Sequence, residues 1–174
     1  MALLLYLDQN YLSGMVKRKP AFRELEHVLR AAVAQGAVTV VESRVHQVES
    51  AARPDLPLLE LLRELSGGLE VADTPGPRER AVLHRLAAVV ERDFPNRHAR
   101  ASDAADFRAL AFALPRCRLV ACDSFMVDVI RRTGLHVRYR VELFGGRRRN
   151  VERLTRRLEA LLGEEAEDAS DHVR

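Results

Sequence analysis

The chain has 174 residues, 47% of them hydrophobic and 30% charged, which is the composition of one globular domain and excludes a disordered or fibrous chain. Its net charge is only +3, but residues 163–174 hold five acids and one base, which leaves a body with 27 basic and 20 acidic residues. No hydrophobic run approaches the roughly 20 residues needed to span a bilayer, and the basic body suits either a polyanionic partner or an ordinary solvated surface.

Short hydrophobic stretches, rich in leucine and β-branched residues, predict buried strands. In chain order they are residues 3–7, 37–41, 118–122 and 141–144, with a further candidate at 136–137. Residues 69–72 are either a brief strand or a simple connection. The first and third of these strands are each followed directly by an aspartate.

Hydrophobic residues spaced three and four apart predict amphipathic helices. In chain order these helices cover residues 21–35, 43–50, 56–65, 78–92, 104–114, 125–132 and 151–162. Strands that alternate with helices predict an α/β fold, an α/β/α sandwich around a central, mostly parallel sheet. We expect one domain over residues 1–162 and a disordered acidic tail over residues 163–174.

Four acidic side chains follow the predicted strands or lie on the helices after them. They are Asp8 after the first strand, Glu49 on the helix after the second, Asp106 in the first turn of helix 104–114, and Asp123 after the third strand. In parallel α/β sheets, ligands bind beyond the carboxyl ends of the strands. Carboxylates that converge there repel one another unless cations lie between them, and Mg²⁺ and Mn²⁺ take oxygen ligands. Such a site can activate water against a phosphodiester.

Each of these acids also has an ordinary structural explanation. Asp8, Asp103 and Asp123 are each placed to cap the N-terminus of a helix. Asp106 lies in a first helical turn, where the helix dipole favours an acid, and a helical glutamate such as Glu49 is most often a surface residue. No single acid is specific, so the prediction depends on their order along the chain. We interpret Asp103 as a cap with a possible indirect role at the site.

In this order the acids resemble those of the PIN-domain nucleases, a family that includes the VapC-type toxins. The matching motifs are Asp8 in LYLDQN, Glu49 in SRVHQVES, Asp106 in DAADFRALAFALP and Asp123 in LVACDSF. The resemblance extends over residues 3–137, which is most of the chain, and the stretch from the helix at 104–114 to the third strand is the most similar part.

Three features depart from the pattern of the small toxins. Residues 9–10 are Gln-Asn, where the toxins usually carry a small hydroxyl residue after the first acid. The segment between Glu49 and Asp103 is longer than in the toxins, and the spacing of Ser43 and His46 ahead of Glu49 is more similar to larger bacterial PIN-like proteins. These departures weaken the toxin role more than the nuclease chemistry.

The resemblance implies a metal-dependent endoribonuclease. Asp8, Asp106 and Asp123 would hold one or two Mg²⁺ or Mn²⁺ ions, and Glu49 would hold an ion or orient the attacking water. Hydrolysis of RNA would leave a 5′-phosphate and a 3′-hydroxyl. We expect a homodimer, with an antitoxin as a possible protein partner and no association with a membrane.

The cellular location is predicted from the cysteines and the N-terminus. Cys117 and Cys122 lie in or near one predicted strand, and the apolar N-terminus lacks the basic residues of a secretory signal. We expect two reduced core cysteines in a cytoplasmic protein rather than a disulfide.

Six further residues are candidates for contacts with substrate. They are Asn10, His46, Ser124, Arg147, Arg148 and Arg149. The arginines follow two glycines, so a flexible turn can bring them to phosphate groups. The alternative is an ordinary basic start of a helix, although basic residues there oppose the helix dipole. Asn10 is placed to orient a metal-bound water, and His46 is either a phosphate contact or a partly buried helix residue.

Two other enzyme classes also place an aspartate after the first strand, the haloacid-dehalogenase-like phosphatases and the response-regulator receivers. Both need a downstream lysine, but the only lysines here are Lys17 and Lys19, and the phosphatases need an acid where Asn10 stands. A non-enzymatic alternative is a catalytically silent PIN-like protein that binds RNA or a protein partner. Retention of all four acids favours an enzyme, because a silent pocket has no need for converging negative charge.

Overall fold

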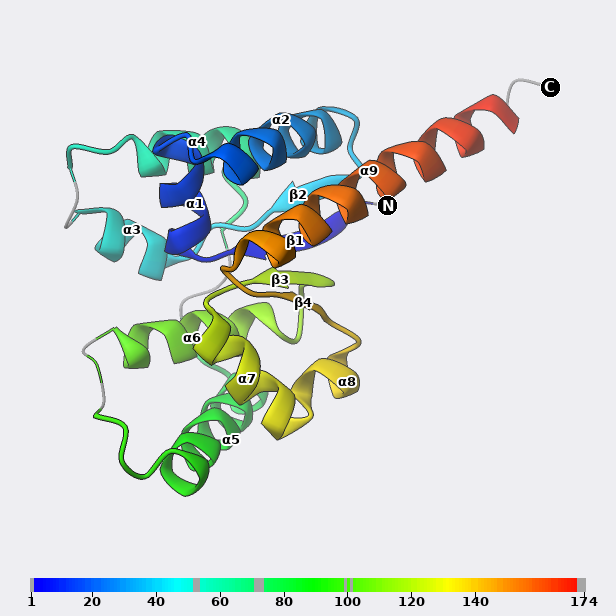
Figure 1. The fold of residues 1–174 in the computed structure, drawn as a ribbon. Coiled ribbons are helices and arrows are strands. Elements are labelled where there is room, and N and C mark those ends of the chain that lie inside the picture. The colour runs from blue at the N-terminus through cyan, green and yellow to red at the C-terminus, as the bar shows by residue number, and fades with distance from the viewer. Residues whose placement is uncertain (1, 52–53, 71–73, 99, 101, 172–174) are drawn as a thin grey trace.

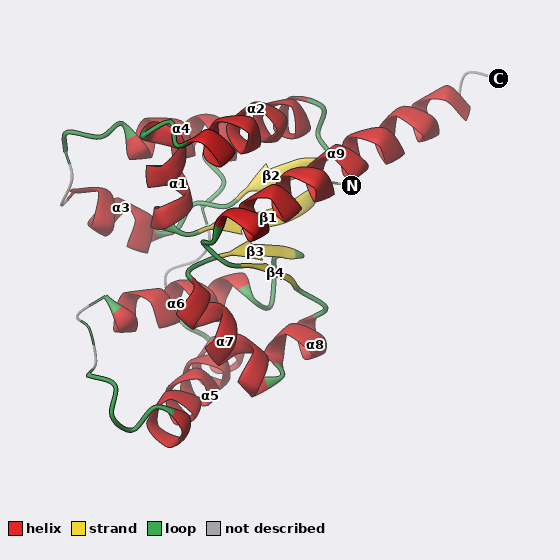
Figure 2. Cartoon of the chain, in the orientation of Figure 1, coloured by secondary structure: helices red, strands yellow, loops and turns green. Residues whose placement is uncertain are grey.

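The protein is described by a computed structural model that covers residues 2–51, 54–70, 74–98, 100 and 102–171. The strands of this part are β1 (Leu3–Leu7), β2 (Val38–Val40), β3 (Leu119–Ala121) and β4 (Glu142–Phe144). They form one sheet in the order β2-β1-β3-β4, and every pair of neighbours is parallel. The four carboxyl ends therefore meet at one edge of the sheet, as Figures 1 and 2 show.

Helices cover both faces of the sheet and confirm the predicted α/β/α sandwich. One layer is formed by α1 (Gln9–Val16), α2 (Pro20–Ala34), α4 (Leu58–Ser66) and α9 (Arg148–Asp171), with α3 (Arg44–Ala51) at its edge. The other is formed by α5 (Pro77–Asp93), α6 (Asp103–Ala113), α7 (Ser124–Thr133) and α8 (Leu135–Tyr139). No helix of the described residues is long and apolar enough to cross a bilayer.

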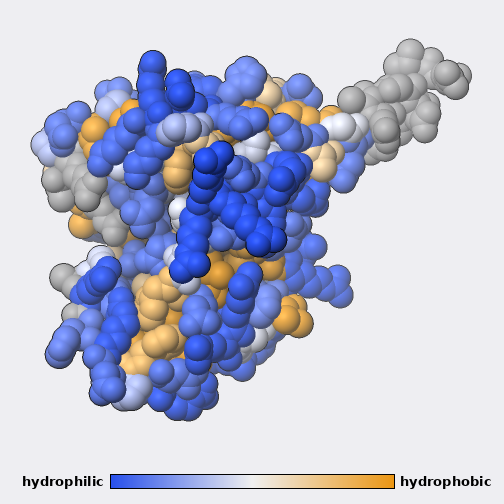
Figure 3. Space-filling view, viewed as in Figure 1, coloured by the Kyte–Doolittle hydropathy of each residue, from blue (hydrophilic) through white to orange (hydrophobic). Residues whose placement is uncertain are grey.

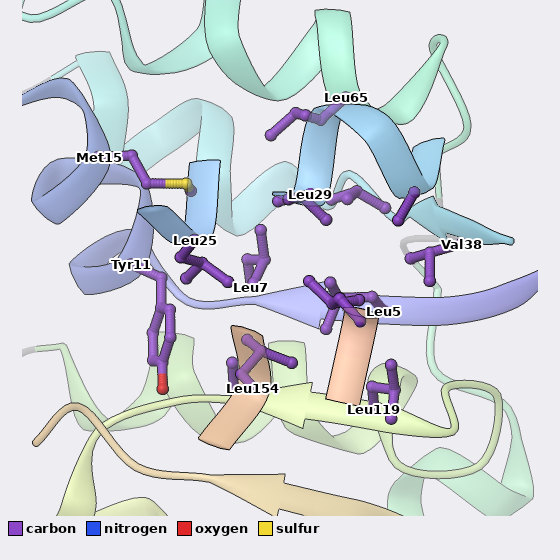
Figure 4. Close-up of a cluster of buried hydrophobic side chains, with 14 of the residues drawn as sticks. Leu5, Leu7, Tyr11, Met15, Leu25, Leu29, Val38, Leu65, Leu119 and Leu154 are labelled. Atoms are coloured by element: carbon purple, nitrogen blue, oxygen red, sulfur yellow. The ribbon is translucent and has the colours of Figure 1, made fainter. Parts of the chain in front are cut away.

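Alternation along the central strand divides the core into two halves. Leu5 and Leu7 point into the layer of α1, α2, α4 and α9, where Figure 4 shows them close to Leu25 and Leu29. Tyr6 points to the opposite face and packs with the layer of α5 to α8. Strand β1 lies between β2 and β3 and is covered on both faces. Asp8, the residue directly after it, is therefore buried.

One helix was missed and one strand candidate is wrong. Residues 9–16 form α1, which sequence analysis did not predict because the polar pair at 9–10 begins a helix whose buried face is short. Residues 136–137, a strand candidate, lie in α8, because Gly134 ends α7 in a left-handed conformation (φ 70°) and the chain re-enters a helix at once. Helix α9 continues to Asp171, residues 172–174 lie outside the described part, and the predicted disorder of the tail from Gly163 stays a prediction.

The other predicted strands and helices are present with shifts of a few residues at their ends. Of the uncertain segment 69–72, Glu70 forms an isolated parallel bridge with Glu42, and residues 71–73 lie outside the described part. Cys117 and Cys122 are buried and unpaired, as predicted.

Candidate active site

Asp8 leaves the carboxyl end of β1 and caps the N-terminus of α1. Its Oδ1 accepts a hydrogen bond of 2.7 Å from the backbone N–H of Gln9, and its Oδ2 accepts one of 3.1 Å from the side-chain amide of Asn10. Its own backbone N–H donates to the carbonyl oxygen of Ala121 at 2.8 Å. Asp8 is only 8% exposed, so these contacts hold a carboxylate at the edge of the core.

Asp123 occupies the equivalent place after β3. Its Oδ1 accepts a hydrogen bond of 2.7 Å from the backbone N–H of Met126 and so caps α7. Because Leu7 pairs with Ala121 in the parallel register of β1 and β3, the two aspartates leave neighbouring strands at nearly the same level. Each acid is therefore a helix cap that also belongs to one carboxylate pair, so capping does not exclude the predicted role as a metal ligand, which stays a prediction.

Burial and the neighbouring charge of Asp123 raise the pKa of Asp8 to about 6. Burial is the larger cause, because it disfavours the charged carboxylate, and the negative charge of Asp123 adds to it. The N–H groups of Gln9, Asn10 and the Asp123 backbone favour the ionised form and limit the rise. A buried carboxylate with an acidic neighbour is stabilised by either a proton or a cation.

Asp106, in the first turn of α6, is the third acid at this edge. Its charge acts on the thiol of Cys122, as do the charges of Asp8 and Asp123, and all three raise the pKa of that thiol beyond the effect of burial. Cys122 lies directly before Asp123 at the end of β3. Three of the four predicted acids therefore surround the carboxyl end of β3.

Glu49, the fourth predicted acid, lies on α3, but its side chain is outside the described part of the structure. Among the described residues, no group of three His, Cys, Asp or Glu side chains is arranged to hold a metal ion. Mg²⁺ is commonly bound by only one or two carboxylates, with waters and substrate phosphate as its other ligands. The oxygen donors of Asp8 and Asp123 therefore fit such an ion as a two-carboxylate site.

Arg97 is a cation at this site that sequence analysis missed. It forms a two-point ion pair with Asp103, in which Nη2 donates to Oδ1 at 2.9 Å and Nη1 contacts Oδ2. Asp103 also accepts a 2.8 Å hydrogen bond from the backbone N–H of Arg100. The Arg97 pair is the main reason why the pKa of Asp103 is lowered. Asp103 is thus a structural partner of the α5–α6 loop.

The Arg97 guanidinium is held over the ring of Phe125, 3.8 Å from its centroid. Its charge interacts with Asp123 and Asp106 as well as with its direct partner Asp103. The ring of Phe94 packs edge-on against Phe125, with 5.2 Å between the two centroids. The only signal in the sequence was an arginine six residues before an acid, and spacing within an irregular loop does not predict contact.

His46 lies on α3, but its side chain is fully buried (0% exposed). Its Nδ1 accepts a 3.1 Å hydrogen bond from the backbone N–H of Ser43, so the ring proton lies on Nε2, which donates to the carbonyl oxygen of Leu7 at 2.7 Å. The ring also stacks on Tyr6. Burial lowers the pKa of His46 to about 4. Of the two interpretations offered by the sequence, the structure agrees with a buried helix residue and not with a phosphate contact, and the contacts of His46 fix the end of β1 that carries Asp8.

Two other candidates for substrate contact lie at the carboxyl edge. Asn10 orients the carboxylate of Asp8 through its side-chain amide. Ser124 is exposed, and its Oγ lies 3.3 Å from the place that a Cβ would take at Gly145. The hydroxyl of Tyr11 donates to the carbonyl oxygen of Gly145 at 2.7 Å, which ties the turn after β4 to α1.

The predicted arginines Arg147, Arg148 and Arg149 are all exposed at the start of α9. This turn follows β4, the neighbour of β3, so it lies at the same edge of the sheet as the carboxylates. Arg148 forms a surface pair with Glu152 (Nε–Oε1 2.7 Å). Figure 3 shows hydrophilic side chains gathered over the first turns of α9, beside an apolar strip over α6 and α7.

Comparisons with known proteins give no relative: no protein-family model, no curated protein and no solved structure matches the chain significantly. The similarity to PIN-domain nucleases therefore stays a prediction that rests on the four motifs. Apart from these motifs, a functional proposal can rest only on the geometry at the carboxyl edge of the sheet.

Proposed function

We propose that the chain is a metal-dependent ribonuclease of the PIN type, with its active site at the carboxyl edge of the sheet. The observation that carries the proposal is the carboxylate pair of buried Asp8 and half-buried Asp123, in which burial and the neighbouring charge raise the pKa of Asp8 to about 6. Like charges placed together away from water are unfavourable unless a cation accompanies them. The pair is therefore a candidate ligand set for Mg²⁺ or Mn²⁺.

A bound divalent ion supplies Lewis acidity toward the phosphodiester and makes water a stronger nucleophile. The chain's own residues then have separate tasks. Asp8 and Asp123 hold the ion, Asn10 orients the Asp8 carboxylate, and Asp106 adds negative charge beside them. Glu49 remains the predicted residue that orients the attacking water. The products would be a 5′-phosphate and a 3′-hydroxyl.

Arginine side chains near the acids can bind the phosphate groups of RNA. Arg97 keeps three of its five N–H donors after the two-point pair with Asp103, and these can bind the phosphate that is cleaved. Arg147 and Arg149, exposed at the start of α9, can bind neighbouring phosphates. The site therefore combines acids for a metal ion with guanidinium groups for the substrate backbone.

The test is cleavage of end-labelled single-stranded RNA with Mg²⁺, Mn²⁺ or EDTA, by the wild type and by Asp8→Asn and Asp123→Asn. We expect cleavage only with a metal ion and a loss of at least about 100-fold in each variant. Asp128→Asn on α7, which removes a half-exposed carboxylate paired with Arg132, is the matched control and should retain activity. Full activity in both site variants would contradict the proposal.

A catalytically silent RNA-binding protein is the second candidate. It is favoured by one observation: Arg97 already places a positive charge near Asp103, Asp106 and Asp123, which lessens the need for a metal ion. This candidate predicts RNA binding that does not change with EDTA and no cleavage under any condition. A homodimer and an antitoxin partner follow from the family resemblance alone and are proposed on that basis.

A further inference from the structure

A pocket of about 450 Å³ opens between α5 and α8, away from the carboxylate site. Helix α8 precedes β4, so the pocket lies toward the amino edge of the sheet, whereas the acids follow the carboxyl ends. In Figure 1, α8 and the loop that joins α5 to α6 lie at opposite ends of the same layer. The carboxylate site therefore does not account for this pocket.

The pocket has an apolar floor and a basic rim. Val82 and Leu135 are buried and form the floor, and Tyr139 adds an aromatic ring that is half-buried. Three arginines complete the lining, namely Arg78, Arg85 and Arg138. No acidic side chain contributes to the lining. The pocket thus offers apolar surface and several positive charges to one ligand.

Within the described residues, no carboxylate neutralises the charges of these three arginines. Arg85 donates only to the backbone carbonyl of Thr133, at 3.3 Å, and Arg138 lies 5.7 Å from the ring centroid of Tyr139. Within the part of the chain that the structure describes, neither they nor Arg78 form an ion pair. Carboxylate partners are found elsewhere for Arg30, Arg92, Arg97, Arg116, Arg132, Arg148 and Arg157.

Three positive charges around one concave surface repel one another and attract an anion. Guanidinium groups bind phosphate through paired N–H donors, and an aromatic ring with an apolar floor suits a planar base. A volume of 450 Å³ lies within the range of small-ligand sites and is large enough for one nucleotide.

We propose that the α5–α8 pocket binds a nucleotide, with its phosphate on Arg78, Arg85 and Arg138 and its base against Tyr139 and the apolar floor. The ligand is either a free nucleotide or one nucleotide of an RNA strand. Along α5, Arg78 and Arg85 lie about 22 Å and about 12 Å from the end of the helix, where the Arg97 loop begins, so an RNA strand can reach from the pocket to that loop. The proposal does not depend on cleavage.

The test is titration of the wild-type chain, in EDTA at low salt, with AMP, adenosine, inorganic phosphate and a single-stranded RNA octamer. Two independent variants remove the pocket: Arg85→Gln with Arg138→Gln, which removes two charges, and Ala81→Glu, which places an acid in the lining from an exposed helical position. The matched control is Arg23→Gln with Arg156→Gln, two exposed arginines on the other layer. Circular dichroism checks that each variant is folded.

We expect AMP to bind at least about 10-fold more tightly than adenosine or phosphate alone, because only AMP fills both parts of the pocket. Both pocket variants should weaken AMP and octamer binding by about 10-fold or more, and the control should not. If the wild type binds the octamer but not AMP, and both pocket variants lose octamer binding, the nucleotide in the pocket belongs to an RNA strand. Binding of AMP and octamer that is the same in wild type, both pocket variants and control would overturn the proposal. Absence of ribonuclease activity would leave these results unaffected.

Discussion

The Nε2 atom of His46 donates a 2.7 Å hydrogen bond to the carbonyl oxygen of Leu7, the residue directly before Asp8. A helix that follows β2 thereby holds the end of β1, and the hydrogen bond from Ser43 fixes the ring in the tautomer that this contact needs. The carboxylate that carries the proposed site is thus positioned by a neutral, buried imidazole. This arrangement makes the stability of the fold sensitive to pH.

We expect His46→Gln to lower the free energy of unfolding by about 2 kcal/mol at pH 7, because glutamine can replace the donor to Leu7 but not the acceptor for Ser43 or the ring stacked on Tyr6. The pKa of His46 is lowered from 6.5 to about 4, so the unfolded chain takes up the proton first as the pH falls. The stabilisation from His46 is therefore complete above pH 6.5 and is lost as the pH falls toward 4.

Urea unfolding at several pH values measures this effect. The difference between wild type and His46→Gln should shrink steadily from pH 7 to pH 4. A difference that stays constant over this range would show that the imidazole is not held neutral by the fold.

Asp8→Asn should raise the free energy of unfolding of the metal-free protein, whereas His46→Gln lowers it. The pKa of Asp8 is raised from 3.8 to about 6, so as the pH rises the unfolded chain loses its proton first, and folding becomes less favourable between these two values. Asparagine can still cap α1 but carries no charge. We expect the variant to be more stable than the wild type by about 1–3 kcal/mol above pH 6 and of similar stability below pH 4.

The measurement is urea unfolding of wild type and Asp8→Asn in EDTA. Asp128→Asn, which removes a half-exposed acid, is the control. Its free energy of unfolding should stay within about 0.5 kcal/mol of wild type at every pH. In the wild type, the contributions of Asp8 and His46 oppose each other between pH 4 and 6. Asp8→Asn should therefore lose stability on acidification more steeply than the wild type. If Asp8→Asn is no more stable than wild type at pH 8, the charged Asp8 carboxylate does not destabilise the folded protein.

Much of this fold could be predicted because its signals are local and periodic. The strands β1 and β3 are short hydrophobic runs, and the acids after them were correctly placed at one edge by the rule for parallel sheets. Helix α1 was missed because its buried face consists of only a few residues after two polar ones. The segment 136–137 was misassigned because two β-branched or ring-bearing residues do not distinguish one helical turn from a strand.

The parts of the site that were missed depend on long-range contacts. The full burial of His46 follows from the way α3 packs on β1, whereas the sequence indicated only a partly buried helix residue as the more plausible of two interpretations. The place of Arg97 depends on the path of an irregular loop between α5 and α6 that has no periodic pattern. Residues on strands and helix caps were therefore placed by rule, whereas the histidine and the arginine needed the three-dimensional structure.

The cysteines should be unreactive in the native protein. Burial raises the pKa of Cys117 to about 12, and burial with three nearby carboxylates raises that of Cys122 well above its usual value. The thiolate is the reactive form. We expect an aromatic disulfide reagent to modify neither thiol of the folded chain at pH 8 and both thiols in guanidinium chloride. Rapid modification of a thiol under native conditions, at a rate faster than global unfolding, would contradict the burial of the end of β3.

Arg97→Gln should destabilise the protein because it leaves Asp103 without its partner in a position that is only 7% exposed. We expect a loss of about 1–3 kcal/mol, because the buried carboxylate then keeps only the hydrogen bond from the Arg100 backbone N–H. Arg92→Gln is the matched control from the end of α5. Arg92 pairs with Asp93 in water, with 68% of its side chain exposed, so its loss should leave the free energy of unfolding nearly unchanged.

A double-mutant cycle with Asp103→Asn separates the pair from the rest of the site. If Arg97 and Asp103 act mainly on each other, the double variant should be more stable than the sum of the single changes predicts, with a coupling of about 1 kcal/mol or more. Arg97 also interacts with Asp106 and Asp123, so its removal should in addition weaken RNA binding in EDTA, whereas Asp103→Asn should weaken it less. Zero coupling together with unchanged RNA affinity would mean that the guanidinium over Phe125 serves neither the loop nor the substrate.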